Sequence, residues 1–153
     1  MYRLISALGV VVAACLALGC GSSGEDATTA RETVATTLTK AQFIKRAEAI
    51  CESVRADRIA ALNSFGKKSS ARAGAGDAAK TITAPSLNRE AEELKGLEAP
   101  AQDKANLASL VSALSKMSKA FENGSSGAKT AISVLPQYQQ DSVALGLGKC
   151  RQP

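Results

Sequence analysis

Hydrophobic residues in the stretch 38–153 recur at steps of three and four positions, which is the spacing of one face of an α-helix. The beginning of this pattern carries the clearest local signal in the chain. Thr39 and Gln42 have the spacing of a capping box, and Leu38 and Phe43 occupy the positions of a hydrophobic staple. Because these four residues agree on one helix start, we predict that the first helix begins here.

The first predicted helix has one apolar face, which Arg58 interrupts. We expect the helix to end near Gly66, because glycine is favoured just past a helix C-terminus. The next stretch, 67–79, is rich in small and basic residues, and we interpret it as a loop that can continue as helix at either end. The predicted core positions of the helix are Ile44, Ala47, Cys51, Val54, Leu62 and Phe65.

The second and third predicted helices are shorter. The second runs from about Ser86 to Gly96, with Pro85 tolerated at its entry. The third opens after Pro100, carries Asp103 in its first turn, and has apolar residues at strict 3-4-3-4 spacing until Asn123-Gly124 ends it. On the second helix, the side expected to face solvent carries three glutamates: Glu90, Glu92 and Glu93.

The fourth predicted helix ends at Gly146, and Pro136 is expected to kink or break it. Its apolar face carries Ala131, Leu135, Tyr138 and Leu145. Four amphipathic segments with modest loops predict an all-α domain, an up-down-up-down bundle of about four helices.

Composition agrees with this fold class. Hydrophobic residues make up 45% of the 153 residues, many of them alanine, whereas aromatic residues contribute 3%. Such small side chains favour closely approaching helices over a sheet core. The length fits one domain once a leader is removed, and the formal net charge of +5 is too mild to name a partner.

The first twenty residues predict export and lipid attachment. Arg3 precedes an apolar run that is too short for a comfortable bilayer span. The residues 16–20, Leu-Ala-Leu-Gly-Cys, resemble the lipobox of bacterial lipoproteins. We therefore predict a signal peptide at 1–19, acylation of Cys20 with palmitate as one expected chain, and a flexible tether at 20–37. The domain at 38–153 would then be anchored to the extracytoplasmic face of the cell membrane.

Two alternatives to acylation at Cys20 remain open. Cleavage before Cys15 matches the large-residue position of the lipobox better, and an ordinary signal peptide would leave no lipid at all. Cys20 is favoured because polar residues follow it at once. It also leaves two cysteines, Cys51 and Cys150, which can pair in an oxidising compartment.

A Cys51–Cys150 disulfide fits the predicted bundle. Cys51 lies on the apolar face of the first helix, and Cys150 follows the last helix by a few residues. Because the first and last helices of an antiparallel four-helix bundle share an end, the short C-terminal segment can fold back to the first helix. The alternative for Cys51 is a small buried hydrophobic residue.

Three stretches of the chain carry a family resemblance: Leu38-Thr39-Lys40-Ala41-Gln42-Phe43-Ile44 with Ala49-Ile50-Cys51, then Glu93-Leu94-Lys95-Gly96-Leu97-Glu98-Ala99-Pro100, and Ala144-Leu145-Gly146-Leu147-Gly148-Lys149-Cys150. Together they resemble a group of small, uncharacterised helical lipoproteins from high-GC Gram-positive bacteria. The resemblance implies a helical extracytoplasmic domain with a terminal disulfide, and it implies no activity. The chain departs from that group in its Gly- and Ser-rich insert after Phe65, where the others look more helical.

Candidate chemistry is sparse. The chain contains no histidine, which removes the commonest general base and the commonest neutral metal ligand. The stretch 74–81 is close to a phosphate-binding loop, but no apolar strand precedes it. Ser64 with Lys67 and Ser126 with Lys129 have the spacing of penicillin-recognising enzymes, whose other motifs are missing. We expect no catalytic residues, no metal and no cofactor.

A basic grouping around the expected loop lacks interleaved aromatic residues: Lys67, Lys68, Arg72 and Lys80. This composition favours a solvated loop, and we expect no nucleic-acid partner. The sequence thus favours a lipid-anchored, non-enzymatic module that binds an envelope protein or a small ligand. An envelope spacer is one alternative, and a hydrolase with carboxylate or serine–lysine chemistry is another. An apolar pocket between helices would favour ligand binding, and a broad exposed apolar patch would favour a protein partner. Ionisable groups that converge in a cleft would favour an enzyme.

Overall fold

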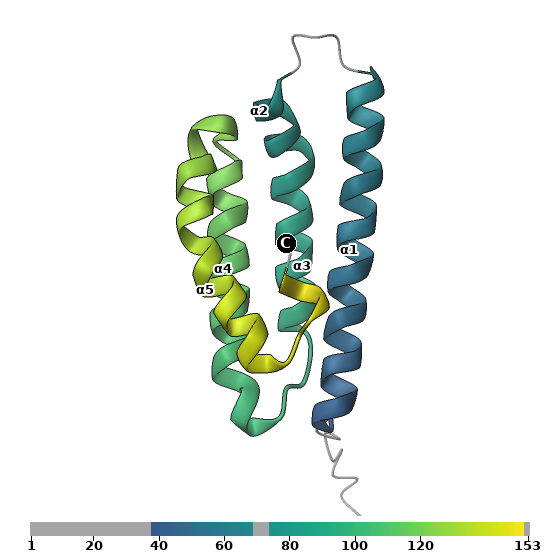
Figure 1. The fold of residues 1–153 in the computed structure, drawn as a ribbon, viewed down its shortest axis with the longest axis vertical. Coiled ribbons are helices and arrows are strands. Elements are labelled where there is room, and N and C mark those ends of the chain that lie inside the picture. The colour runs from purple at the N-terminus through teal and green to yellow at the C-terminus, as the bar shows by residue number, and fades with distance from the viewer. Residues whose placement is uncertain (1–37, 69–73, 152–153) are drawn as a thin grey trace, which may run out of the picture. The chain divides into compact units, whose positions relative to one another are not determined.

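A computed structural model describes residues 38–68 and 74–151, which belong to one compact unit. Four long helices build it: α1 (Lys40–Lys68), α3 (Ala84–Lys95), α4 (Lys104–Phe121) and α5 (Ala128–Leu145). Consecutive long helices run in opposite directions, and the part of the chain that the structure describes contains no strand (Figure 1). The predicted all-α, up-down-up-down bundle is confirmed.

Helix α1 begins as the capping pattern predicts. The Thr39 backbone N–H donates to Gln42 Oε1 over 3.0 Å, and the Gln42 N–H donates to Thr39 Oγ1 over 3.3 Å. Helix α1 continues two residues beyond the expected end near Gly66, to Lys68. Gly66 is an exposed helical position, since a side chain placed there would meet nothing within 4 Å. A glycine inside a helix costs about 1 kcal/mol relative to alanine, and the helical turns that precede Gly66 outweigh this cost.

The second helical stretch begins earlier than predicted. The short helix α2 (Ala75–Ala78) leads through a π-helical turn (Ala79–Thr83) directly into α3. Pro85 lies at the second position of α3, directly after the π-helical turn. The stretch 67–79, predicted as a loop that can continue as helix at either end, is helical at both ends, and residues 69–73 lie outside the described part.

Helix α5 is continuous through Pro136, so of the predicted kink or break, the break does not occur. Proline at position 136 removes the donor that the Ile132 carbonyl would accept. Ile132 is 66% exposed, so water can satisfy that carbonyl, and the helix continues. The helix ends at Gly146, as predicted, because Gly146 adopts a left-handed conformation with φ of +76°.

The core lies between the facing sides of the four helices. The predicted apolar faces supply most of it, and Leu62 is an exception at 36% exposed. Helix α1 therefore leaves the core beyond Arg58, although its apolar pattern continues. The largest fully buried apolar and aromatic side chains are Tyr138, Phe43, Leu87, Leu94, Leu110, Leu114, Leu145 and Leu147.

The C-terminal segment crosses from α5 to α1 and ends in a 3-10 turn (Lys149–Arg151; Figure 1). Cys150 in this turn is joined to Cys51 of α1, with the two Cα atoms 5.2 Å apart and a sequence separation of 99. Both cysteines are buried. The predicted pairing thus links the first helix to the end of the chain.

Candidate ligand-binding site

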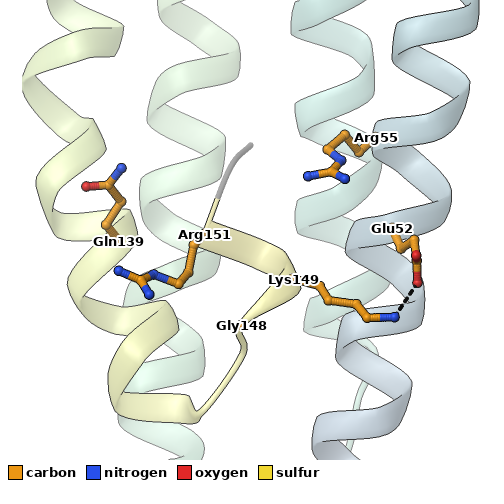
Figure 2. Close-up of a pocket in the computed structure, with 6 residues that line it drawn as sticks. All are labelled: Glu52, Arg55, Gln139, Gly148, Lys149 and Arg151. Atoms are coloured by element: carbon orange, nitrogen blue, oxygen red, sulfur yellow. Dashed lines mark hydrogen bonds and ion pairs between the residues drawn. The ribbon is translucent and has the colours of Figure 1, made fainter.

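A pocket of about 540 Å³ lies where the C-terminal turn meets α1 and α5 (Figure 2). We call it the basic pocket, because three of the described residues that line it are basic and one is acidic. Its charged residues reach it from two distant parts of the sequence. The lining residues are Glu52, Arg55, Gln139, Gly148, Lys149 and Arg151.

The one acidic residue of this lining is engaged by Lys149. The Lys149 ammonium lies 2.7 Å from a carboxylate oxygen of Glu52, and the Lys149 backbone N–H donates to Glu48 Oε1 over 3.1 Å. The ion pair lowers the pKa of Glu52 and raises the pKa of Lys149. Both side chains are more than half exposed, so the pair contributes little to stability, but it directs Lys149 toward α1.

The two arginines approach the pocket from different walls. Figure 2 shows Arg55 extending from α1 and Arg151 extending from the C-terminal turn toward Gln139 of α5. Since Glu52 offsets one of the three cations, the described lining keeps a net positive charge. The pocket is therefore suited to a negatively charged group.

An apolar groove of about 370 Å³ adjoins the basic pocket. It lies among α3, α4 and α5, and it shares two lining residues, Gln139 and Arg151, with the basic pocket. The apolar groove therefore opens at one end into a cluster of cations. The other residues of the groove are Thr83, Leu87, Met117, Phe121, Ala131, Ile132 and Leu135.

A buried polar cluster joins α1, α3 and α5 inside the bundle. The Tyr138 hydroxyl donates to Glu90 Oε1 over 3.2 Å, and Arg58 interacts electrostatically with both residues. Glu90 is 1% exposed and Arg58 is 6% exposed. Burial raises the pKa of Glu90 to about 7, lowers the pKa of Arg58, and raises the pKa of Tyr138.

The prediction that Glu90 faces solvent is wrong. Glu90 lies three residues after Leu87 and four before Leu94, which places all three on one face of α3. Opposite this face, Arg58 occupies the apolar side of α1 and supplies a charge that compensates the carboxylate. Arg58 and Glu90 both stand on apolar faces, and this shared anomaly was the sequence signal for their pairing.

The structure brings together the two cysteines that the sequence predicts to pair. Cys51 and Cys150 are joined, whereas Cys20, its rival Cys15 and the tether 20–37 lie outside the described residues. The disulfide also has a consequence that sequence reasoning missed. Lys149 and Arg151 flank Cys150, so the bond holds two cations of the basic pocket in place.

Two residues of the predicted basic grouping around the expected loop have described side chains, and neither belongs to the basic pocket. Lys67 and Lys80 are exposed and line neither cavity, and Arg72 lies outside the described residues. The cations that converge are distant in sequence and belong to no motif. The two basic residues beside Cys150 were the available signal, since a predicted disulfide fixes the position of its neighbours.

No protein-family model, curated protein or solved structure matched this chain in the three comparisons made. The resemblance to helical lipoproteins therefore stays a prediction. In residues 38–68 and 74–151, no group of three His, Cys, Asp or Glu side chains could hold a metal ion. None of the helices in those ranges is long and apolar enough to cross a membrane.

Proposed function

We propose that this protein is a lipid-anchored, extracytoplasmic module that binds a small ligand and catalyses no reaction. The lipid on Cys20 would hold it to the outer face of the cell membrane, and the helical domain would carry the binding site. The observation that supports binding is the apolar groove that opens into the basic pocket. A concave apolar surface with a few polar groups at one end is the usual form of a small-molecule site.

A small ligand is favoured over a protein partner because the exposed apolar residues are scattered. Four large hydrophobic side chains are exposed in the described part of the chain, and they lie on two helices. Ile59 and Leu62 are neighbours on one face of α1 and make only a small patch, whereas Ile132 and Val143 belong to α5 and are eleven residues apart. Single exposed hydrophobic residues are normal on protein surfaces, whereas a partner surface needs a contiguous patch. A spacer that binds nothing would not need the groove.

An enzyme is disfavoured by the pKa values of the candidate groups. In the basic pocket, the pKa of Glu52 is lowered and the pKa of Lys149 is raised, so both move away from neutrality. A general acid or base works best with a pKa near the working pH. Glu90 has such a pKa, but its side chain is buried and lines neither the groove nor the basic pocket.

Ligand binding is tested with an uncharged fluorescent apolar probe, N-phenyl-1-naphthylamine, added to the full-length protein. We expect saturable fluorescence, and we expect Ile132→Glu to weaken probe binding about tenfold, because it places a charge in the apolar groove. Val143→Glu is the matched control, since Val143 is 58% exposed on the same helix and does not line the groove. Absence of saturable binding, or equal loss in both variants, would overturn the proposal.

The anchor is tested separately by labelling cells with an alkyne analogue of palmitate. We expect the wild-type protein and the Cys15→Ser variant to carry the label and to sediment with membranes. The Cys20→Ser variant should lose both properties. Label that persists in Cys20→Ser and disappears in Cys15→Ser would assign the lipid to the rival cysteine.

A further inference from the structure

We propose that the groove and the basic pocket together bind one fatty acid anion, with its alkyl chain in the groove and its carboxylate beside Arg151. This inference rests on the proposed function as a ligand-binding module. It names the chemical class of the ligand, which neither cavity alone defines.

The groove has the chemistry of a site for an alkyl chain. Six of its described lining residues are apolar, and its polar residues are Thr83, Gln139 and Arg151. From Ala131 to Gln139 the groove follows α5 over eight steps of the helical rise, or about 12 Å, which suits an alkyl chain of medium length. A volume of about 370 Å³ is at the small end of the range for ligand sites and favours a single chain.

The charged end of the site favours an anion with a planar head. Arg151 and Gln139 line both cavities, so they mark the point where the groove meets the basic pocket. An arginine fork donates two parallel hydrogen bonds to a carboxylate, and the Gln139 amide can donate one more. Figure 2 shows Arg151 and Gln139 next to each other, with Arg55 across the pocket. A carboxylate placed there would lie in a pocket whose described lining carries three cations and one carboxylate.

The carboxylate of Glu52 does not compete for this position. Its oxygen is bound by Lys149 on the α1 side of the pocket, whereas Arg151 extends toward α5 (Figure 2). No carboxylate among the described residues lines the groove itself. An uncharged or cationic amphiphile would place no anion beside Arg151, so we expect the site to select by head-group charge.

The experiment compares four amphiphiles with the same alkyl chain, each below its critical micelle concentration: dodecanoate, dodecanol, dodecyltrimethylammonium and dodecyl phosphate. Each displaces N-phenyl-1-naphthylamine from the full-length protein. We expect dodecanoate to bind at least about tenfold more tightly than dodecanol and the ammonium compound, because charge-assisted hydrogen bonds contribute that much or more. Dodecyl phosphate that binds about tenfold more tightly than dodecanoate would overturn the assignment of a carboxylate head.

Arg151→Gln tests the role of the shared arginine. We expect dodecanoate binding to weaken about tenfold in this variant while dodecanol binding changes less than about twofold, since only the anion contacts the guanidinium. Arg46→Gln is the matched control, because Arg46 is exposed on α1 and lines neither cavity. Equal loss for both ligands would overturn the head-group assignment.

The outcomes separate this inference from the proposed function. If all four amphiphiles displace the probe equally well, the protein binds apolar ligands and the fatty acid inference is wrong. If neither the probe nor any amphiphile binds, the proposed function itself fails.

Discussion

The two halves of α1 share one apolar pattern but have different surroundings. In the N-terminal half, residues 40–54, the core positions Phe43, Ala47, Cys51 and Val54 are 0 to 3% exposed. In the C-terminal half, residues 55–67, Ile59 is 49% exposed. The C-terminal segment packs on the first half (Figure 1). The comparison teaches that periodicity identifies a face that can be buried, whereas a packing partner decides whether it is.

The N-terminal half of α1 is also held to the rest of the bundle by more interactions than the C-terminal half. A capping box, the disulfide and the ion pair between Lys40 and the buried Asp103 hold the N-terminal half. The C-terminal half is joined to α3 through the buried Arg58–Glu90 interaction and an exposed Arg89–Asp57 pair. Because local stability follows buried contacts, we expect the C-terminal half to open before the bundle unfolds. The basic pocket uses Glu52 and Arg55, where the two halves meet.

The largest expected effect comes from removing the disulfide. The variant with both Cys51→Ala and Cys150→Ala should lose about 4 to 5 kcal/mol of unfolding free energy, because the bond closes a loop of about 100 residues in the unfolded chain. Denaturant unfolding measures this loss. Hydrogen exchange should then show that the N-terminal half of α1 opens as readily as its C-terminal half.

The reduced wild-type protein is the control for this variant, and the two should unfold alike. Unfolding curves that coincide for the oxidised wild type and the double alanine variant would show that the disulfide does not distinguish the two halves.

The next effect is expected at the buried polar cluster. Arg58→Met should cost about 1 to 3 kcal/mol at neutral pH, because the buried Glu90 carboxyl loses the nearby positive charge and is driven to take up a proton. Combining Arg58→Met with Glu90→Leu should recover most of this loss, since two buried charged groups are often no better for stability than well-packed apolar residues. Urea unfolding of the single and double variants measures the coupling.

Arg55→Met is the matched control for Arg58→Met, since Arg55 is on the same helix but is less buried. A loss at Arg55 as large as that at Arg58 would contradict the special role of the buried cluster.

Glu90 should also make stability depend on pH. Its pKa in the folded protein is about 7, against an ordinary value of 4.5, so between these values the folded state keeps a proton that the unfolded chain has lost. Stability should therefore fall as the pH rises from about 4.5 to 7, by up to about 3 kcal/mol. Thermal unfolding across this range measures the slope.

Glu90→Gln should remove this slope, because its amide does not titrate. The lowered pKa of Glu52 affects stability below 4.5 and with the opposite sign, so it does not interfere. A wild-type protein whose stability follows the same pH profile as the Gln variant would contradict the assignment to Glu90.

The smallest effect compares the two halves directly. Ala49 and Gly66 are both exposed helical positions of α1. Ala49→Gly should cost about 1 kcal/mol, as glycine does in a helix interior. Gly66→Ala should raise the global unfolding free energy by less than that, because the C-terminal half opens locally first. Denaturant unfolding with equal slopes compares the shifts in midpoint of the two variants. Shifts of equal size would contradict the difference between the two halves of α1.

Local chemistry made much of the fold predictable from the sequence. The capping box at Thr39 marks the start of α1, and the left-handed Gly146 marks the end of α5, both where the sequence predicts them. The pairing of Cys51 with Cys150 followed from an even count and from the common end of the first and last helices. Pro136 does not break α5, because the effect of a proline inside a helix depends on whether water reaches the carbonyl one turn earlier.

The binding site could not be predicted in this way. Arg55 and Arg151 are ordinary surface residues in sequence, nearly a hundred positions apart, and they line one pocket because the disulfide turns the end of the chain back onto α1. Glu90 looks like its neighbours Glu92 and Glu93 in sequence, and only the packing of α1 shows that Arg58 lies opposite it.

The sequence by itself determined where helices begin, which of their faces are apolar, and which cysteines can pair, because each of these depends on residues one or two turns apart or on a count. The tertiary structure decided which apolar positions are covered, which charges are buried together, and where a groove meets cations. Those features depend on distances between helices, and a distance between helices is set by the packing of all of them.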